Sequence, residues 1–97
     1  MSEQEYRMVP LAYPLVGYLS LNEQECYVSA VMSLKPSQGH VRRLLERLQE
    51  MFPSVKIPNP IHPAMVHLAE SLGFTRTREY WELANEWIDV WVWEARE

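Results

Sequence analysis

The chain has 97 residues, enough for one domain with a single hydrophobic core. Apolar residues make up 47% of the sequence, a share that excludes intrinsic disorder. The formal net charge of −4, from 13 acidic and 9 basic side chains, argues against nucleic acid as the main partner.

The charge is unevenly distributed along the chain. Residues 35–47 hold 4 of the 9 basic groups and 1 acid, whereas residues 79–97 hold 6 acids and 1 arginine. One end of an acidic molecule can therefore bind an anion.

Targeting and redox features predict a soluble protein of the cytoplasm. The first residues are polar and acidic, unlike a secretory signal peptide. No apolar run approaches the roughly 18 residues needed to cross a membrane, so no membrane partner is expected. The single cysteine, Cys26, cannot form an internal disulfide, and we expect a buried, reduced thiol.

The amino-terminal third predicts extended structure. Residues 6–12 contain Pro10 and predict an edge strand or extended arm. Residues 15–21 are rich in strand-forming side chains, and residues 26–34 alternate between two faces. The polar residues 22–25 join these two segments, which together predict a hairpin.

A helix is predicted over residues 37–52, with Ser37 as its N-cap and Pro53 as its stop. Residues 54–57 then predict a short strand, and the order strand, helix, strand implies a parallel pair. The apolar residues at helical spacing are Val41, Leu44, Leu45, Leu48 and Phe52.

The remaining third predicts a second helix and a final hairpin. Pro63 suits the first helical position, and Gly73 a left-handed helix end with Phe74 packing back on the last turn. Residues 75–81 and 87–94 predict strands that flank a polar connection. The buried stripe expected for the helix is Met65, Leu68, Ala69 and Leu72.

The junction of the strand-like residues 26–34 and the first helix predicts an anion site. Gly39 lies at the turn, and the free N–H groups and dipole of a helix N-terminus favour negative charge. Arg42, Arg43 and Arg47 lie just inside the helix, where a bound phosphate would compensate their unfavourable interaction with the dipole. The alternative interpretation is a solvated basic face.

This order of elements resembles that of the GCN5-related N-acetyltransferases, the GNAT superfamily. The family's acyl-CoA loop runs Arg/Gln-x-x-Gly-x-Gly/Ala and continues with Arg-x-Leu-Leu. Here Gly39 takes the first glycine, Val41 takes the second small position, and residues 42–45 (Arg-Arg-Leu-Leu) resemble the continuation. Residues 71–74 (Ser-Leu-Gly-Phe) resemble the end of the family's second helix, and residues 87–94 its terminal strand.

The resemblance covers residues 15–94 and implies a minimal GNAT-like α/β fold. The expected fold is a single domain over residues 1–97, with a twisted, mostly antiparallel sheet of five to six strands and two helices. The family's usual first strand and two helices have no counterpart in the sequence. Small relatives of this kind occur among bacteriophage proteins, so a viral origin is a hypothesis.

The resemblance implies transfer of an acyl group from acetyl-CoA or another acyl-CoA to an amine. Backbone groups before the loop would hold the pantetheine arm like an added strand, and the loop with its arginines would hold the pyrophosphate. The implied cofactor-binding residues are Val31, Met32, Ser33, Gln38, Gly39, His40, Val41, Arg42 and Arg43.

Four positions depart from the family's pattern and leave the catalytic residues unassigned. Pro36 stands at the Arg/Gln position, and Val41 would crowd an approaching pyrophosphate. Ala69 stands where many members carry the tyrosine that protonates the thiolate, and His62 where many carry asparagine. His62 and Tyr80 are the candidate acid–base groups, although His62 also suits a helix cap.

The other histidines and the cysteine predict structural roles. His67 lies mid-helix among apolar neighbours, which predicts a hydrogen-bonded structural histidine. The three histidines and Cys26 show no metal-ligand spacing, so no metal site is expected.

The four tryptophans lie between positions 81 and 93, and Trp87, Trp91 and Trp93 alternate onto one strand face. One interpretation is that they cover the core. The other is a partner surface, for a second copy or a host protein, because exposed aromatic side chains carry much of the binding energy at interfaces. That alternative would make the chain a non-catalytic interaction protein on a GNAT scaffold.

Overall fold

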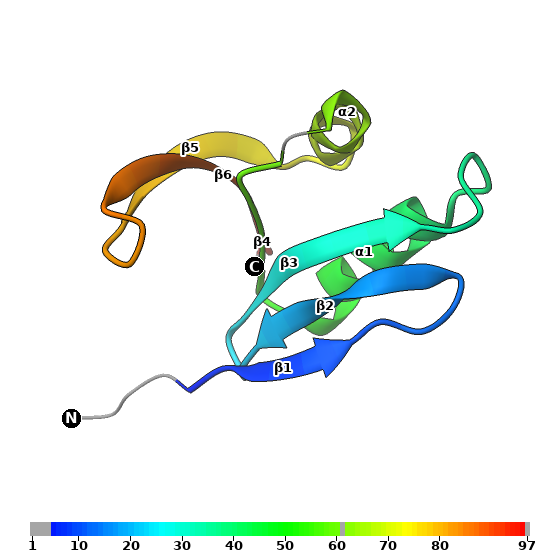
Figure 1. Cartoon of the computed structure of the whole chain (residues 1–97), viewed down its shortest axis with the longest axis horizontal. Helices are drawn as coiled ribbons and strands as arrows, with labels where there is room; N and C mark the ends of the chain where they lie inside the picture. The colour runs from blue at the N-terminus through cyan, green and yellow to red at the C-terminus, as the bar shows by residue number, and fades with distance from the viewer. Residues whose placement is uncertain (1–4, 61, 97) are drawn as a thin grey trace.

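A computed structural model, which describes residues 5–60 and 62–96, folds into one six-stranded sheet and two helices (Figure 1). The strands run in the spatial order β1-β2-β3-β4-β6-β5, in which the β3–β4 pair is parallel and the neighbouring pairs β1–β2, β2–β3, β4–β6 and β5–β6 are antiparallel. The predicted α/β class, with a mostly antiparallel sheet and two helices, is therefore confirmed. The elements are β1 (Arg7–Pro10), β2 (Leu15–Leu21), β3 (Glu25–Ser33), α1 (His40–Met51), β4 (Ser54–Pro58), α2 (Pro63–Ser71), β5 (Thr75–Trp81) and β6 (Glu86–Glu94).

Both helices lie on the same face of the sheet. Leu45 and Leu48 of α1 are buried in the core together with residues from the central strands. Ala69 of α2 joins the same core, and Gln49 Nε2 on α1 donates to the Leu72 carbonyl at 2.9 Å. The opposite surface of the sheet carries no helix among the residues that the structure describes, and we call it the helix-free face. The strand residues of the core are Leu19, Cys26, Val28, Val55, Ile57 and Trp91.

The first helix begins later than the sequence predicts. Ser37 is not its N-cap, because the backbone there is left-handed (φ 68°) and the helix starts only at His40. Gly39 takes the N-cap position with φ 79°, and no side chain caps the helix. The first turn of α1 also contains no acidic residue. A glycine supplies the left-handed turn, at the cost of leaving the helix N-terminus without a side-chain acceptor.

The second helix agrees with the sequence at both ends. Pro63 occupies its first turn, and His62 Nδ1 accepts a hydrogen bond from the Ala64 N–H at 3.1 Å. Gly73 has φ 92°, and Phe74 is buried with its N–H donating to the Ala69 carbonyl at 3.0 Å. The left-handed helix end and the cap role of His62 are therefore confirmed.

The tryptophans of β6 do not form a common surface. Trp91 is only 7% exposed and belongs to the core, and Trp93 packs against that core. Trp87 is 57% exposed, so it alone of the three is available to a partner. The expected partner face of Trp87, Trp91 and Trp93 is wrong, because two of them are used to cover the core beneath the helices.

The thiol of Cys26 is fully buried, and burial raises its pKa to about 12. We expect no reaction of the native protein with a disulfide reagent such as DTNB at pH 8, because the thiolate is the reacting form. One equivalent should react after denaturation. Rapid modification of the native protein would contradict this burial.

Candidate functional site

The central parallel pair separates after a short contact. Glu25, Cys26 and Tyr27 of β3 pair with Ser54, Val55 and Lys56 of β4, and beyond them the two strands diverge (Figure 1). The edge of β3 that faces β4 therefore has no strand partner over residues 28–33, within the described part of the chain. An unpaired strand edge offers N–H and C=O groups to an extended ligand.

A β-bulge accompanies this divergence. Leu19 of β2 pairs with Val28, but the preceding Tyr18 pairs with Ala30, so Ser29 is the extra residue. A bulge bends its strand and increases the local twist. The bend lies just past the last β3–β4 pair, where the two strands begin to diverge.

The predicted ligand-binding residues of β3 lie along this open edge. Val31 packs against the core, and Met32 is exposed on the helix-free face, so the backbone is the part that an extended ligand can use. The Ser33 hydroxyl accepts from the Lys35 N–H at 3.1 Å. Residues 34–39 then bring the chain directly to the N-terminus of α1, which places that helix end beside the end of β3.

The loop before α1 holds one arginine against the helix N-terminus. Arg43 Nη2 donates to the Gln38 carbonyl at 3.1 Å and lies 3.1 Å from His40 Nδ1. A Cβ atom built on Gly39 would lie 3.2 Å from Arg43 Nη1. The guanidinium therefore sits over the glycine turn, next to uncapped helix N–H groups. This arrangement favours an anion.

The other two predicted residues at the start of α1, Arg42 and Val41, have side chains directed away from the glycine turn. Arg42 points along the helix toward α2, with Nη1 3.3 Å from the Ser71 hydroxyl and Nε 3.5 Å from Glu46. The structure therefore brings Gln38, Gly39, His40 and Arg43 together, while the Arg42 side chain lies apart from them. Val41 is half-buried and packs against the core.

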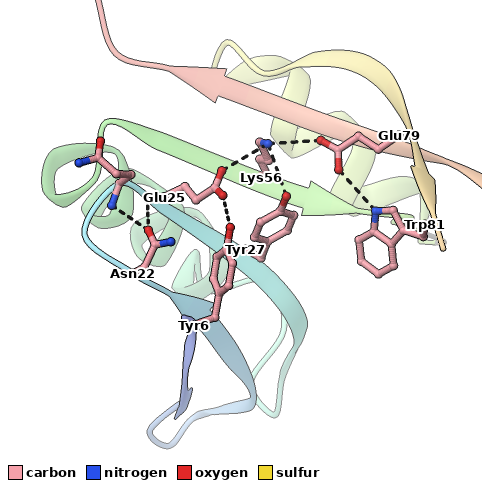
Figure 2. Close-up of polar contacts among 8 residues, drawn as sticks. Tyr6, Asn22, Glu25, Tyr27, Lys56, Glu79 and Trp81 are labelled. Carbon is pink, nitrogen blue, oxygen red and sulfur yellow. Dashed lines mark hydrogen bonds and ion pairs between the residues drawn. The ribbon is translucent and has the colours of Figure 1, made fainter. Parts of the chain in front are cut away.

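A cluster of charged and phenolic groups lies where β3 and β4 pair, on the helix-free face (Figure 2). Lys56 Nζ is 3.3 Å from Glu25 Oε1, 3.3 Å from Glu79 Oε2 and 3.4 Å from the Tyr27 hydroxyl. Tyr6 donates to Glu25, and Trp81 Nε1 donates to Glu79 at 3.4 Å. We call Tyr6, Glu25, Tyr27, Lys56, Glu79 and Trp81 the Lys56 cluster.

Contacts within the cluster keep Lys56 protonated and the Tyr27 phenol neutral at neutral pH. Burial by itself lowers the pKa of Lys56, but the Tyr27 phenol, once it ionises at high pH, and the carboxylates of Glu25 and Glu79 outweigh burial and raise that pKa above its usual range. Burial raises the pKa of Tyr27, which leaves its phenol neutral and able to donate. The cluster therefore offers a fixed cation, two carboxylates and a neutral hydroxyl group.

Replacing Lys56 with methionine should destabilise the fold by about 2 kcal/mol, because two partly buried carboxylates lose their shared cation. The raised pKa of Lys56 means that its contribution is complete below its unfolded pKa of about 10.4 and is lost as pH rises through the folded value. The stability difference between wild type and variant should therefore be constant from pH 6 to 9 in urea unfolding and shrink above that range.

The matched control is Arg76→Met, which removes a more exposed ion pair with Asp89 and should cost less than about 1 kcal/mol. An equal loss of unfolding free energy in both variants would show that the Lys56 cluster stabilises the fold no more than an exposed ion pair does.

The candidate acid–base residues from the sequence lie outside this cluster. His62 is engaged as the cap of α2, and the Tyr80 hydroxyl donates to Asn85 in the β5–β6 hairpin. His67 is exposed on α2, which contradicts the expected structural histidine among apolar neighbours.

Sequence reasoning missed Glu25, Lys56 and Glu79. They come from three strands that are distant in the sequence, and only the pairing register places them on one face. Across residues 5–60 and 62–96, no set of three metal-ligating side chains is positioned to hold a metal ion. Neither helix of that region is long and apolar enough to cross a membrane.

Comparison of the chain with protein-family models, curated proteins and solved structures found no match. The site is therefore interpreted from its own geometry. That geometry is an α/β domain whose parallel strand pair separates and leaves one edge of β3 open, with a helix N-terminus beside the end of that strand and titratable groups where the two strands pair.

Proposed function

We propose that this chain is an acyl-CoA-dependent N-acyltransferase of the GNAT type. The observation that carries the proposal is the open edge of β3 over residues 28–33, which leads to the uncapped N-terminus of α1. An acyl-CoA needs two binding features next to each other: a strand edge for its amide-containing arm and an anion site for its pyrophosphate.

The acyl arm would lie along the open edge of β3 as an added strand, with its amide groups bonded to the backbone of Val31, Met32 and Ser33. Its pyrophosphate would then meet the N–H groups after Gly39 and the guanidinium of Arg43. Since Arg42 is directed toward Ser71 and Glu46, we assign the pyrophosphate to Arg43 rather than to both arginines. The thioester end would extend toward Tyr27, where the strands first pair.

The reaction would move the acyl group from sulfur to nitrogen. A protonated amine first gives up one proton to solvent or to a carboxylate, and its nitrogen then attacks the thioester carbonyl carbon. The new C–N bond forms as the C–S bond breaks, and the second nitrogen proton passes to the leaving thiolate. Tyr27, whose raised pKa leaves a neutral hydroxyl where β3 and β4 last pair, is our candidate for the group that carries this proton to the thiolate.

A second candidate function rests on the tip of the β5–β6 hairpin. Leu83 is fully exposed in the turn, and on the two strands of the hairpin Tyr80 and the strongly exposed Trp87 pack edge to face. Large apolar side chains that remain exposed together are typical of protein interaction surfaces. This surface supports the alternative of a non-catalytic interaction protein, for which a second copy or a host protein would be the partner.

Thermal unfolding with acetyl-CoA tests the proposal. At about 100 times its dissociation constant, a ligand stabilises the folded state by roughly 2.7 kcal/mol. For a domain of 97 residues, that corresponds to a rise in Tm of about 10 °C or more. Adenosine 3′,5′-bisphosphate, which lacks the pantetheine arm, should give a smaller shift. An unchanged Tm at millimolar acetyl-CoA would overturn the acyltransferase and leave the hairpin surface as the functional part.

A further inference from the structure

Strand β5 forms one edge of the sheet (Figure 1). It pairs with β6 on one side and with no other strand in residues 5–60 and 62–96. Natural edge strands are commonly protected from pairing with another chain by short length, a proline or a bulge. The opposite edge strand, β1, follows this rule, because it has 4 residues and ends in Pro10. β5 has 7 residues in a continuous register with β6, contains neither proline nor glycine, and is exposed at every position except Glu79.

Two arginines give this edge a positive charge. Arg76 and Arg78 lie at alternate positions on one face of β5, and their side chains are 62% and 64% exposed. Both approach the same carboxylate, Asp89 of β6, with Arg76 Nη2 at 3.0 Å and Arg78 Nε at 3.9 Å. Two cations therefore share one anion in a chain whose net charge is −4. Each guanidinium has five N–H donors, so one carboxylate cannot satisfy them all.

A second copy of the same strand is a poor partner for this edge. Residues directly opposite each other in an antiparallel pair lie on the same face of the sheet. Antiparallel pairing of two β5 strands brings like charges together, as Arg78 with Arg78, Arg76 with Arg78 or Glu79 with Glu79, depending on the register. Like charges in that position destabilise a strand pair. A strand with carboxylates at alternate positions would instead meet both arginines favourably.

We propose that the outer edge of β5 binds an extended acidic segment of a partner protein as an added strand. Carboxylates at alternate positions of that segment would lie beside Arg76 and Arg78, and its backbone would bond to the N–H and C=O groups of the edge. The Arg78 guanidinium lies 5.9 Å from the centre of the Trp87 ring, which restricts its position before a partner arrives. Tyr80 continues the same face toward the hairpin tip and adds apolar contact. This site is separate from the open edge of β3 and requires no acyl-CoA.

Titration of the full chain with a peptide of alternating valine and glutamate, matched in length to β5, tests the proposal by ¹H–¹⁵N NMR. Saturable shifts are expected at the backbone amides of residues 75–81. The amides of β1 should not shift, although β1 is also an edge strand. The same peptide with lysine in place of glutamate should not bind. Shifts that never saturate, or that are equal on both edges, would overturn the site.

Two N-methylated peptides separate strand addition from simple attraction between charges. Alternate backbone amides of an added strand point toward the edge that it joins, and the others point away. Methylating the amide of every valine and methylating the amide of every glutamate should therefore have different effects. One peptide should lose binding and the other should keep it. Equal affinities of the two methylated peptides would contradict pairing with the strand edge.

Charge reversal on the two edge strands locates the contact. Arg78→Glu should weaken binding of the acidic peptide tenfold or more, because repulsion replaces attraction. Arg78→Gln should weaken it several-fold, which keeps the test valid if the reversal disturbs the hairpin. Arg7→Glu, the same change on β1, should alter the affinity less than twofold. Equal losses for Arg78→Glu and Arg7→Glu would show only general attraction to positive charge and would overturn the site.

Discussion

Replacing Gly17 with alanine is expected to destabilise the protein by about 3 kcal/mol or more, a large share of the roughly 5–15 kcal/mol that holds a small domain together. Gly17 has φ 133°, a conformation that side chains rarely adopt. The added Cβ would lie 2.0 Å from the Ala30 carbonyl oxygen and 2.6 Å from its carbon. Both atoms belong to the backbone, so β3 would have to move away from β2 beside the bulge.

Gly73→Ala is the matched control for this change. Gly73 also has a positive φ of 92°, but a Cβ there would meet only the Trp93 ring, at 3.7 Å. Its cost should be the backbone strain alone, about 1–2 kcal/mol. Urea unfolding of both variants measures the difference, and equal losses would contradict the close approach of β2 and β3.

Gly39→Asp should weaken acetyl-CoA binding by at least tenfold, or about 1.4 kcal/mol. The carboxylate would stand where the pyrophosphate is expected, and like charges about 4 Å apart repel by roughly 1–4 kcal/mol near a protein surface. Asparagine and aspartate both tolerate the left-handed conformation of Gly39, φ 79°, so the fold should survive.

Gly39→Asn is the isosteric control, because it adds the same bulk beside Arg43 without the charge. Calorimetric titration of both variants with acetyl-CoA should show aspartate binding much more weakly than asparagine. If the two variants bind equally well, the pyrophosphate does not lie at this helix N-terminus.

The ends of α2 and the buried side of α1 could be predicted, because residues within each helix determine them. Pro63 and Gly73 mark the ends of α2, and the apolar stripe around Leu45 and Leu48 marks the buried side of α1. The start of α1 was displaced from Ser37 to His40, because Ser37 itself adopts a left-handed conformation that no local pattern indicates.

The features that shape the site depend on contacts between distant strands. The bulge at Ser29 is visible only in the pairing of β2 with β3, since the alternation of residues 26–34 reads as an unbroken strand. Lys56 meets Glu25 and Glu79 through the parallel register of β3 with β4 and the antiparallel ladder beyond it. Period-two alternation correctly predicts that Trp87, Trp91 and Trp93 share one face of β6. It does not predict that Trp91 and Trp93 are covered by the rest of the core.

The most direct test of the proposed acyl-CoA site is amide hydrogen exchange of the protein with and without acetyl-CoA. Residues 28–33 of β3 and 39–43 at the start of α1 should become protected, because the added ligand would pair with the open strand edge and occupy the helix N-terminus. Residues 82–86 at the hairpin tip should be unaffected. Protection confined to the hairpin, or none at saturating acetyl-CoA, would contradict the placement of an acyl-CoA between β3 and β4.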